Sequence, residues 1–310
     1  MSQWLLLAII GHLANAGAFF VDKLLLSAAF KRSATYAMLL GFLSGLLLLL
    51  FPLVQGTPQH LSDILLLFGF GAGFILALWA FFEALRQEEV SRVVPIVGTL
   101  VPLITLLGER LWFQTLFSST QTIGIACLVF ATYLFTRGST KHQPVDIKVI
   151  GLAFTAALLF AITSLSGKAA FSRFQFLDVL VLSRVFSLLT ATAIFFIVGK
   201  EARAEFYSLF QFQRSLKTKL ISRRAALIAI GGQLLSGAGF VCIYLSIQMG
   251  SVAIVNSLQA VQYGFLVVIA WAGGKNLRTL LKEELSSTVV IQKSLGIVAT
   301  GIGLWFLTRG

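Results

Sequence analysis

The chain has few charged residues: they make up 12% of its 310 amino acids, whereas hydrophobic residues make up 57%. A soluble globular protein carries about 25% charged residues, so this chain has too few to cover a water-facing surface. The mean hydropathy of +0.91 agrees with that conclusion. The composition therefore excludes a soluble fold and predicts an integral membrane protein whose solvent is the lipid bilayer.

Cysteine and histidine are also scarce, with two and three residues respectively. Cys127 and Cys242 fall inside apolar segments, and His12, His60 and His142 share no metal-ligand spacing. We therefore predict no disulfide framework, no metal site and no cofactor. The four aspartates are scattered, and no phosphate-binding loop is present. The sequence thus gives no reason to expect an enzyme.

Long apolar runs, in contrast, are abundant. About 20 apolar helical residues are needed to cross the roughly 30 Å core of a bilayer. The runs are continuous and do not alternate every second residue, which favours helices over barrel strands. The sequence predicts an all-α membrane protein with ten transmembrane helices. The predicted spans are residues 4–21, 34–54, 62–84, 90–108, 118–136, 148–168, 176–199, 225–247, 251–272 and 290–308.

Basic residues are distributed unevenly between the loops. All but five of the 24 basic residues follow the first, third, fifth, seventh or ninth span. By the positive-inside rule these loops are cytoplasmic, which predicts a multi-pass protein of the plasma or inner membrane with non-cytoplasmic termini. Part of the excess lies in residues 200–224, whose segment FYSLFQFQRSLKTKL predicts a basic amphipathic helix on the membrane surface. We expect a lipid contact there, and no nucleic-acid partner.

The chain also contains an internal duplication. Thr136-Arg137-Gly138 recurs as Thr308-Arg309-Gly310, and Asp22-Lys23-Leu24 aligns with Gly167-Lys168-Ala169. We predict two five-helix repeats, residues 1–138 and 148–310. Since five is odd, the second repeat enters the membrane from the opposite side. The halves are then related by a pseudo-two-fold axis in the membrane plane, as in many transporters. Glycine-rich third and eighth spans are expected either to pack centrally or to flex.

This duplicated plan resembles the drug/metabolite transporter superfamily and its EamA-like members. The residues that carry the resemblance are Ala84-Leu85, Val94-Pro95-Ile96, Leu100-Val101-Pro102, Gly108-Glu109-Arg110-Leu111, Gln121 with Gly124, and Glu284-Leu285. The resemblance implies a ten-helix transporter whose solute site is lined by spans 1, 3, 4, 6, 8 and 9. Family members usually carry basic residues after the second span, with termini inside. Residues 55–63 contain none, and we follow the charge distribution.

Ionisable side chains inside the spans are candidates for the site, because such a group near the bilayer centre costs about 2.5–3.5 kcal/mol. Glu83 is a candidate proton- or cation-coupling carboxylate, and pairing with Arg86 is the alternative. Lys23 and Lys168 occupy equivalent repeat positions, as interfacial residues or as cationic gates and anion anchors. Arg184 lies well inside the seventh span and cannot lose its charge. Glu109 and Glu284 are interpreted as structural caps of span ends.

Polar and aromatic residues form further candidates. His12, Asn15 and Phe19 share one face of the first span, and Asn256, Gln259 and Tyr263 share one face of the ninth. Such stripes either join helices or line a wet cavity. With the adjacent Gln262, the ninth span has four amide and phenol groups, which favours a cavity. The expected aromatic walls of the site are Phe19, Trp79, Phe82, Phe240, Tyr244 and Tyr263.

The predicted function is a secondary transporter or exchanger that moves a small organic solute by alternating access. Its partners would be the solute, the lipid bilayer and a coupling proton or counter-solute, with Glu83 or His12 as the proton-carrying group. Arg184 and the two lysines favour an anionic or zwitterionic solute. A non-transporting membrane scaffold or assembly subunit is the alternative. A lipid-modifying enzyme would need a carboxylate or metal cluster, which the sequence lacks.

Overall fold

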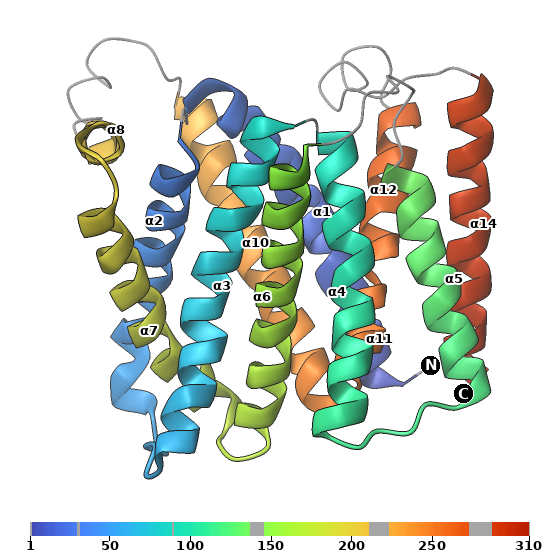
Figure 1. The fold of residues 1–310 in the computed structure, drawn as a ribbon, viewed down its shortest axis with the longest axis horizontal. Coiled ribbons are helices and arrows are strands. Elements are labelled where there is room, and N and C mark those ends of the chain that lie inside the picture. The colour runs from blue at the N-terminus through green and yellow to red at the C-terminus, as the bar shows by residue number, and fades with distance from the viewer. Residues whose placement is uncertain are drawn as a thin grey trace.

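The computed structural model describes residues 2–29, 32–88, 90–136, 146–210, 223–272 and 287–309. These residues form helices that stand side by side, and both termini lie at the same end of the bundle (Figure 1). We call this end the terminus end. The helices of the first half are α1 (Gln3–Ala29), α2 (Ser33–Ser44), η1 (Gly45–Leu53), α3 (Leu61–Gln87), α4 (Val90–Trp112) and α5 (Ser119–Thr136). Those of the second half are α6 (Ile147–Phe171), α7 (Phe176–Ile197), α8 (Lys200–Phe210), α10 (Arg223–Met249), α11 (Val252–Ser257), α12 (Gln259–Ala272) and α14 (Ser287–Arg309).

The predicted fold class is confirmed: the described residues are helical and contain no strand. Seven of the described segments are long and apolar enough to cross a membrane, and two shorter apolar helices, Gln3–Ala18 and Ser119–Phe135, accompany them. Each of the ten predicted spans coincides with one helix or with two consecutive helices. The number of actual crossings stays a prediction.

Two predicted spans are not single regular α-helices. Residues 34–54 form α2 followed by the 3₁₀ helix η1, which contains Pro52, a residue without an amide hydrogen. Residues 251–272 divide at Leu258 into α11 and α12. At this break the Ser257 hydroxyl and the Leu258 amide both donate to the carbonyl oxygen of Ile254, at 2.7 and 3.2 Å. The hydroxyl thus competes with the backbone pattern that would continue the helix.

Much of the packing joins helices of different halves: α3 lies against α6, α1 against α10, α5 against α14, and α2 against α7. The described helices of the two predicted repeats are therefore interleaved. The centre of the bundle contains the largest apolar cluster, to which α1, α3, α5, α6, α7 and the α10–α12 segment all contribute.

Glycines permit the closest of these approaches. A Cβ atom on Gly11 of α1 would lie 2.9 Å from the Gly239 carbonyl oxygen of α10, and the reverse substitution would meet the Gly11 oxygen at the same distance. A Cβ atom on Gly71 of α3 would collide with the Ser183 carbonyl oxygen of α7. Gly237, in contrast, faces open space. Close packing thus explains some glycines of the third and eighth spans, but not all of them.

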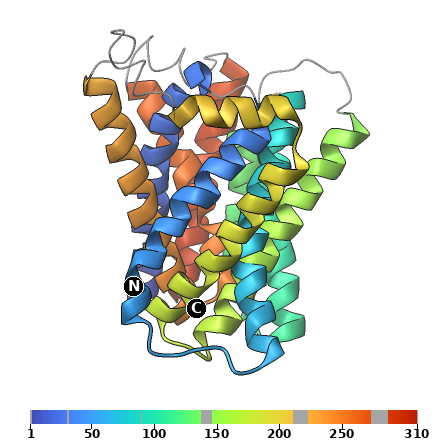
Figure 2. The same cartoon turned by 90° about the vertical axis from the view of Figure 1, so that its left-hand side faces the viewer.

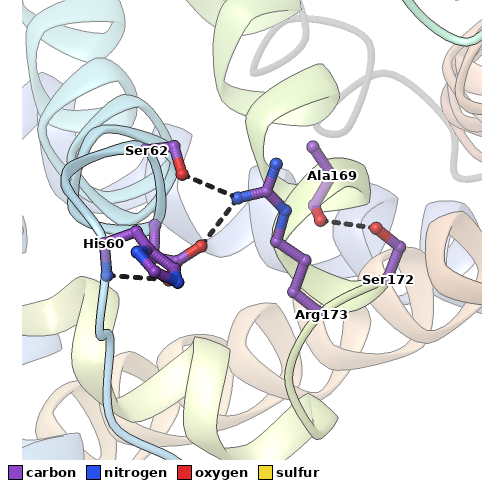
Figure 3. A network of polar contacts seen from close by, with 6 residues as sticks. His60, Ser62, Ala169, Ser172 and Arg173 are labelled. Carbon is purple, nitrogen blue, oxygen red and sulfur yellow. Dashed lines mark hydrogen bonds and ion pairs between the residues drawn. The ribbon is translucent and has the colours of Figure 1, made fainter.

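The terminus end is held together by polar contacts between the halves. Arg173, which follows α6, donates to Ser62 Oγ at 3.0 Å and to Asp63 Oδ1 at 2.7 Å, at the start of α3 (Figure 3). Asp178 of α7 accepts from the backbone N–H groups of Gln55 and Gly56, at 3.0 and 2.9 Å. These bonds fix the chain before α3 against the α6–α7 connection.

At the opposite end α8 lies across the bundle (Figure 2). Its Glu201 pairs with Arg32, and its Glu205 accepts from the Thr35 hydroxyl of α2 at 3.0 Å. The last residues of α8 begin the predicted amphipathic segment, most of which lies outside the described residues.

Candidate functional site

A carboxylate and an ammonium group hold the turn between α10 and α11 at the terminus end. Glu109, near the end of α4, is 2% exposed. Its oxygens accept from Ser251 Oγ at 2.6 Å, Val252 N at 2.9 Å and Ala253 N at 2.8 Å. Because these N–H groups open α11, Glu109 acts as a charged cap for a helix of the other half.

Lys168 of α6 holds the other side of the same turn. Its ammonium group donates to the carbonyl oxygens of Ile247 at 2.9 Å, Gln248 at 3.1 Å and Gly250 at 2.8 Å. An ammonium group has three hydrogens, so all of them are used. The lysine thus satisfies the carbonyls that the end of α10 leaves free. Its repeat equivalent, Lys23, has a side chain outside the described part of the structure.

The break between α11 and α12 faces the first helix. His12 of α1 is 5% exposed, and its Nε2 atom lies 2.9 Å from the carbonyl oxygen of Val255. Gln262 of α12 lies beside the same ring. This carbonyl belongs to the last turn of α11, where the helix break leaves acceptors without helical partners. The first and ninth predicted spans therefore meet through polar groups.

The remaining residues of the ninth-span stripe lie on both sides of the break. The Gln259 amide donates to the Tyr263 hydroxyl at 2.8 Å. The Tyr263 ring lies against Gly98 of α4, where an added Cβ would be 3.4 Å from the ring. Asn256 Nδ2 is buried and has no hydrogen-bond partner, and the same holds for the hydroxyl of Thr99 on α4. Because α4 packs against α11, these unpartnered groups belong to facing helices of different halves.

Arg184 of α7 is 2% exposed and surrounded by aromatic rings. Its guanidinium carbon lies 5.4 Å from the ring centre of Phe70 on α3 and 5.6 Å from that of Phe240 on α10. Tyr244 packs beside both rings, with centroid distances of 4.7 Å to Phe70 and 4.3 Å to Phe240. We call these three rings and the arginine the arginine box.

The hydrogen bonds of Arg184 are incomplete. Its Nε atom donates to the Leu180 carbonyl of its own helix at 3.1 Å. Its Nη2 atom is buried and has no partner. Within the described residues, no carboxylate pairs with this guanidinium. A buried cation in such surroundings is costly unless something else completes its coordination.

The third-span candidates lie elsewhere. Glu83 Oε2 accepts from Ser33 Oγ at 2.5 Å, and Oε1 accepts from Gln87 at 2.9 Å and from Arg86 at 3.3 Å. Phe82 packs edge-on against Tyr36 of α2, with ring centres 4.7 Å apart. Trp79 joins an apolar cluster formed with α2, α7 and α8.

The structure therefore divides the predicted site residues into groups. His12, Asn256, Gln259 and Tyr263 gather at the broken helix, and Arg184 and Tyr244 form the arginine box. Tyr244 belongs to the central apolar cluster and Tyr263 packs against it, so this cluster joins the two groups. Asn15 lies at the α1–α10 contact beside Gly239. The side chain of Phe19 lies outside the described part.

Sequence reasoning missed two residues. Phe70 forms one wall of the arginine box. It is the only large side chain in a stretch of small residues, with Gly69 and Gly71 on either side, and this pattern was a usable signal. Thr99 has an unpartnered buried hydroxyl and lies between the two prolines of the fourth span. Thr99 carries the only hydroxyl between these two prolines, which was a second signal.

Comparison with known proteins bears on the first half of the chain. Residues 2–137 match the model of the EamA-like transporter family. No curated protein matches the chain. One solved structure, described only as "Crystal structure of protein", is similar over 100% of this chain and 99% of its own, with a TM-score of 0.68 and 13% sequence identity. At that identity the similarity shows a shared fold and gives no information about the solute.

Proposed function

The chain belongs to the drug/metabolite transporter superfamily, and from that premise we propose that it is a secondary active transporter or exchanger of a small organic solute. The solute binds between the halves, at the broken helix α11–α12 and the arginine box. The halves then open alternately to the two sides of the membrane.

The helix pairing supports two inverted repeats, residues 1–138 and 148–310. In the predicted repeat, α1 corresponds to α6, α2 to α7, α3 to α10, and α5 to α14. If each helix is exchanged with its counterpart, the α1–α10 pair becomes the α6–α3 pair. The same exchange leaves the α5–α14 and α2–α7 pairs unchanged. All four pairs are present and are the strongest contacts between the halves apart from α4–α6 and α3–α7. A two-fold relation between the halves accounts for this pattern.

One observation carries the proposal: unpartnered buried polar groups gather around a broken helix at the meeting of the halves. Leaving a buried donor or acceptor without a partner costs about 1–3 kcal/mol. A scaffold protein with a dry interior gains nothing from keeping Thr99 and Asn256 in that state. A transporter does, because interrupted helices and free polar groups bind the solute or its hydration water.

The polar contacts at the terminus end favour this end as the closed side of the proposed cycle. Glu109 and Asp63 of the first half bind groups of the second half there, and the Ser246 hydroxyl donates to the Trp4 carbonyl at 2.6 Å. Opening this side would break these bonds. His12 is the better candidate for a proton carrier, since Glu83 already accepts three hydrogen bonds near the opposite end.

Transport is tested with the purified protein in liposomes. A panel of radiolabelled amino acids, sugar phosphates, nucleotides and cationic drugs is offered to liposomes that contain wild type, the Asn256→Leu variant, or no protein. We expect wild-type liposomes to accumulate one solute class and Asn256→Leu to abolish that uptake without loss of folded protein. The Thr308→Val variant, at an exposed position, serves as the control.

If no class accumulates, and the joint substitution of Asn256, Gln259 and Tyr263 changes stability alone, the scaffold alternative is correct. A further readout concerns the mode of coupling. Uptake that requires a preloaded solute indicates exchange, whereas uptake that follows a pH gradient indicates proton coupling.

A further inference from the structure

We infer that the transported solute carries an oxyanion group, a carboxylate or a phosphate, and that this group binds the free edge of Arg184 in the arginine box. The inference rests on the proposed transport function and identifies the solute class that the function leaves open. It assigns the anchoring role to a helix, α7, that the family resemblance does not place around the site.

The state of Arg184 is the first argument. It is 2% exposed, and its Nη2 atom has no partner. Other described arginines have carboxylates: Arg173 pairs with Asp63 at 2.7 Å and Arg86 with Glu83 at 3.3 Å. A guanidinium keeps its charge in proteins, so burial cannot be relieved by deprotonation. A ligand oxyanion supplies the missing partner.

The geometry of the box is the second argument. Phe70 and Phe240 lie within about 6 Å of the guanidinium carbon, the range of a cation–π contact. Rings attract the cation but accept no conventional N–H hydrogen bond, so they stabilise the charge of Arg184 without satisfying its N–H donors. The guanidinium N–H donors form a planar fork that suits carboxylate and phosphate oxygens.

The position of Arg184 is fixed independently of any ligand. The residue just before Arg184 and the residue one turn after it both touch α3: Ser183 lies in close contact with Gly71, and the Ser187 hydroxyl donates to the Gly71 carbonyl at 3.0 Å. The backbone that bears Arg184 therefore cannot retreat from Phe70. Since Phe70 comes from α3 of the first half and Phe240 and Tyr244 come from α10 of the second half, an anion bound here would contact elements of both halves.

A cationic solute fits the described interior poorly. The carboxylates that face other elements are already occupied: Glu83 accepts from three groups, Glu109 from three, and Asp178 from two. The unpartnered groups among the described residues include the donors Arg184 Nη2 and Asn256 Nδ2, beside His12 Nδ1 and the Thr99 hydroxyl. Because the charged group among them is a guanidinium, they favour a ligand that brings oxygen atoms.

The test measures binding with probes that share one ring and differ in the charged group. Phenylacetate, phenyl phosphate, phenylacetamide and phenethylamine are added separately to the purified protein, and thermal unfolding gives the affinity of each. We expect the two anions to stabilise the wild type, and the neutral amide and the cationic amine to have little effect. The Arg184→Gln variant should bind the anions at least about tenfold more weakly, equivalent to 1.4 kcal/mol.

Two further variants keep the result interpretable. Arg184→Lys retains the charge without the planar fork and should bind the anions with intermediate affinity. Arg309→Gln is the matched control, because Arg309 also stacks on a ring, Trp305 at 4.5 Å, but is exposed. It should bind like wild type. A purely structural arginine would lower the unfolding temperature when replaced and leave anion selectivity unchanged.

The outcomes separate this inference from the transport proposal. The inference is wrong if neither anion stabilises the wild type more than phenylacetamide does, or if Arg184→Gln retains anion binding. This holds even when liposomes accumulate a neutral or cationic solute. If anions bind through Arg184 but no flux occurs with any solute, the binding site stands and the transport function fails. The relative affinities of phenylacetate and phenyl phosphate decide between a carboxylate and a phosphate.

Discussion

Replacing Glu109 tests whether the α4 carboxylate fixes the α10–α11 turn. The charge is 2% exposed, with three donors within 2.6–2.9 Å. In Glu109→Gln the remaining oxygen can keep the two bonds that Oε2 accepts from Ser251 and Ala253. The Val252 amide is then left facing an NH₂ group. One unsatisfied buried donor costs about 1–3 kcal/mol.

Glu109→Ala removes both oxygens and leaves the Val252 and Ala253 amides without acceptors. The expected loss is then about 2–6 kcal/mol, twice the cost of one donor. The matched control is Glu201→Gln, which removes a carboxylate whose side chain is 77% exposed and pairs with Arg32. A surface ion pair contributes about 0–1 kcal/mol, so this variant should resemble wild type.

Unfolding can be followed with a thiol-reactive fluorophore. Cys127 and Cys242 are free, partly buried and inside helices, so they react when the helices separate. We expect the order of unfolding free energies to be wild type, equal to Glu201→Gln, then Glu109→Gln, then Glu109→Ala. Equal stability of Glu109→Ala and Glu201→Gln would refute the capping role, whatever the absolute values.

Four further predictions concern the same bundle. Lys168→Met leaves three carbonyls without their donor and should lower the free energy of unfolding by about 3 kcal/mol or more, at about 1–3 kcal/mol for each carbonyl, measured by the same thiol assay. Gly71→Ala should prevent close packing of α3 on α7 and reduce the yield of folded protein in size-exclusion chromatography. Gly237→Ala faces open space and should be neutral or up to about 1 kcal/mol more stable. A reporter fused after Gly310 should give a non-cytoplasmic signal, and a cytoplasmic signal would overturn the orientation predicted from the charges.

Most of the fold could be predicted from the sequence because lipid imposes one dominant requirement. Every backbone group must form its hydrogen bond within the span, so each long apolar run must be helical. The length of the run then determines the length of the helix. The third span, predicted as 62–84, is the helix Leu61–Gln87, and the tenth, predicted as 290–308, is Ser287–Arg309. The breaks were not predictable, because hydropathy does not record whether a serine such as Ser257 bonds back onto its own helix.

The candidate site was less predictable, because a polar residue in a span does not reveal its partner. Asn256 and Gln259 were assigned to one stripe, yet Gln259 bonds Tyr263 while the amide nitrogen of Asn256 bonds nothing. Trp79 was expected in the solute site, but its ring packs with the α2–α7–α8 cluster. Helix periodicity defines a face, and tertiary packing decides what that face meets.

Two cations show how partners decide the role of a charge. Lys168, which is half-buried at a span end, and Arg184, which is buried inside a span, are both candidates for binding an anion. Lys168 donates all three hydrogens to carbonyls, so an anion there would have to displace bonds that hold the α10–α11 turn. Arg184 donates from Nε to a carbonyl of its own helix, and its Nη2 atom has no partner. An anion that binds Nη2 therefore displaces no hydrogen bond. The solute is therefore expected at the arginine, and the lysine is expected to hold the turn that closes the terminus end.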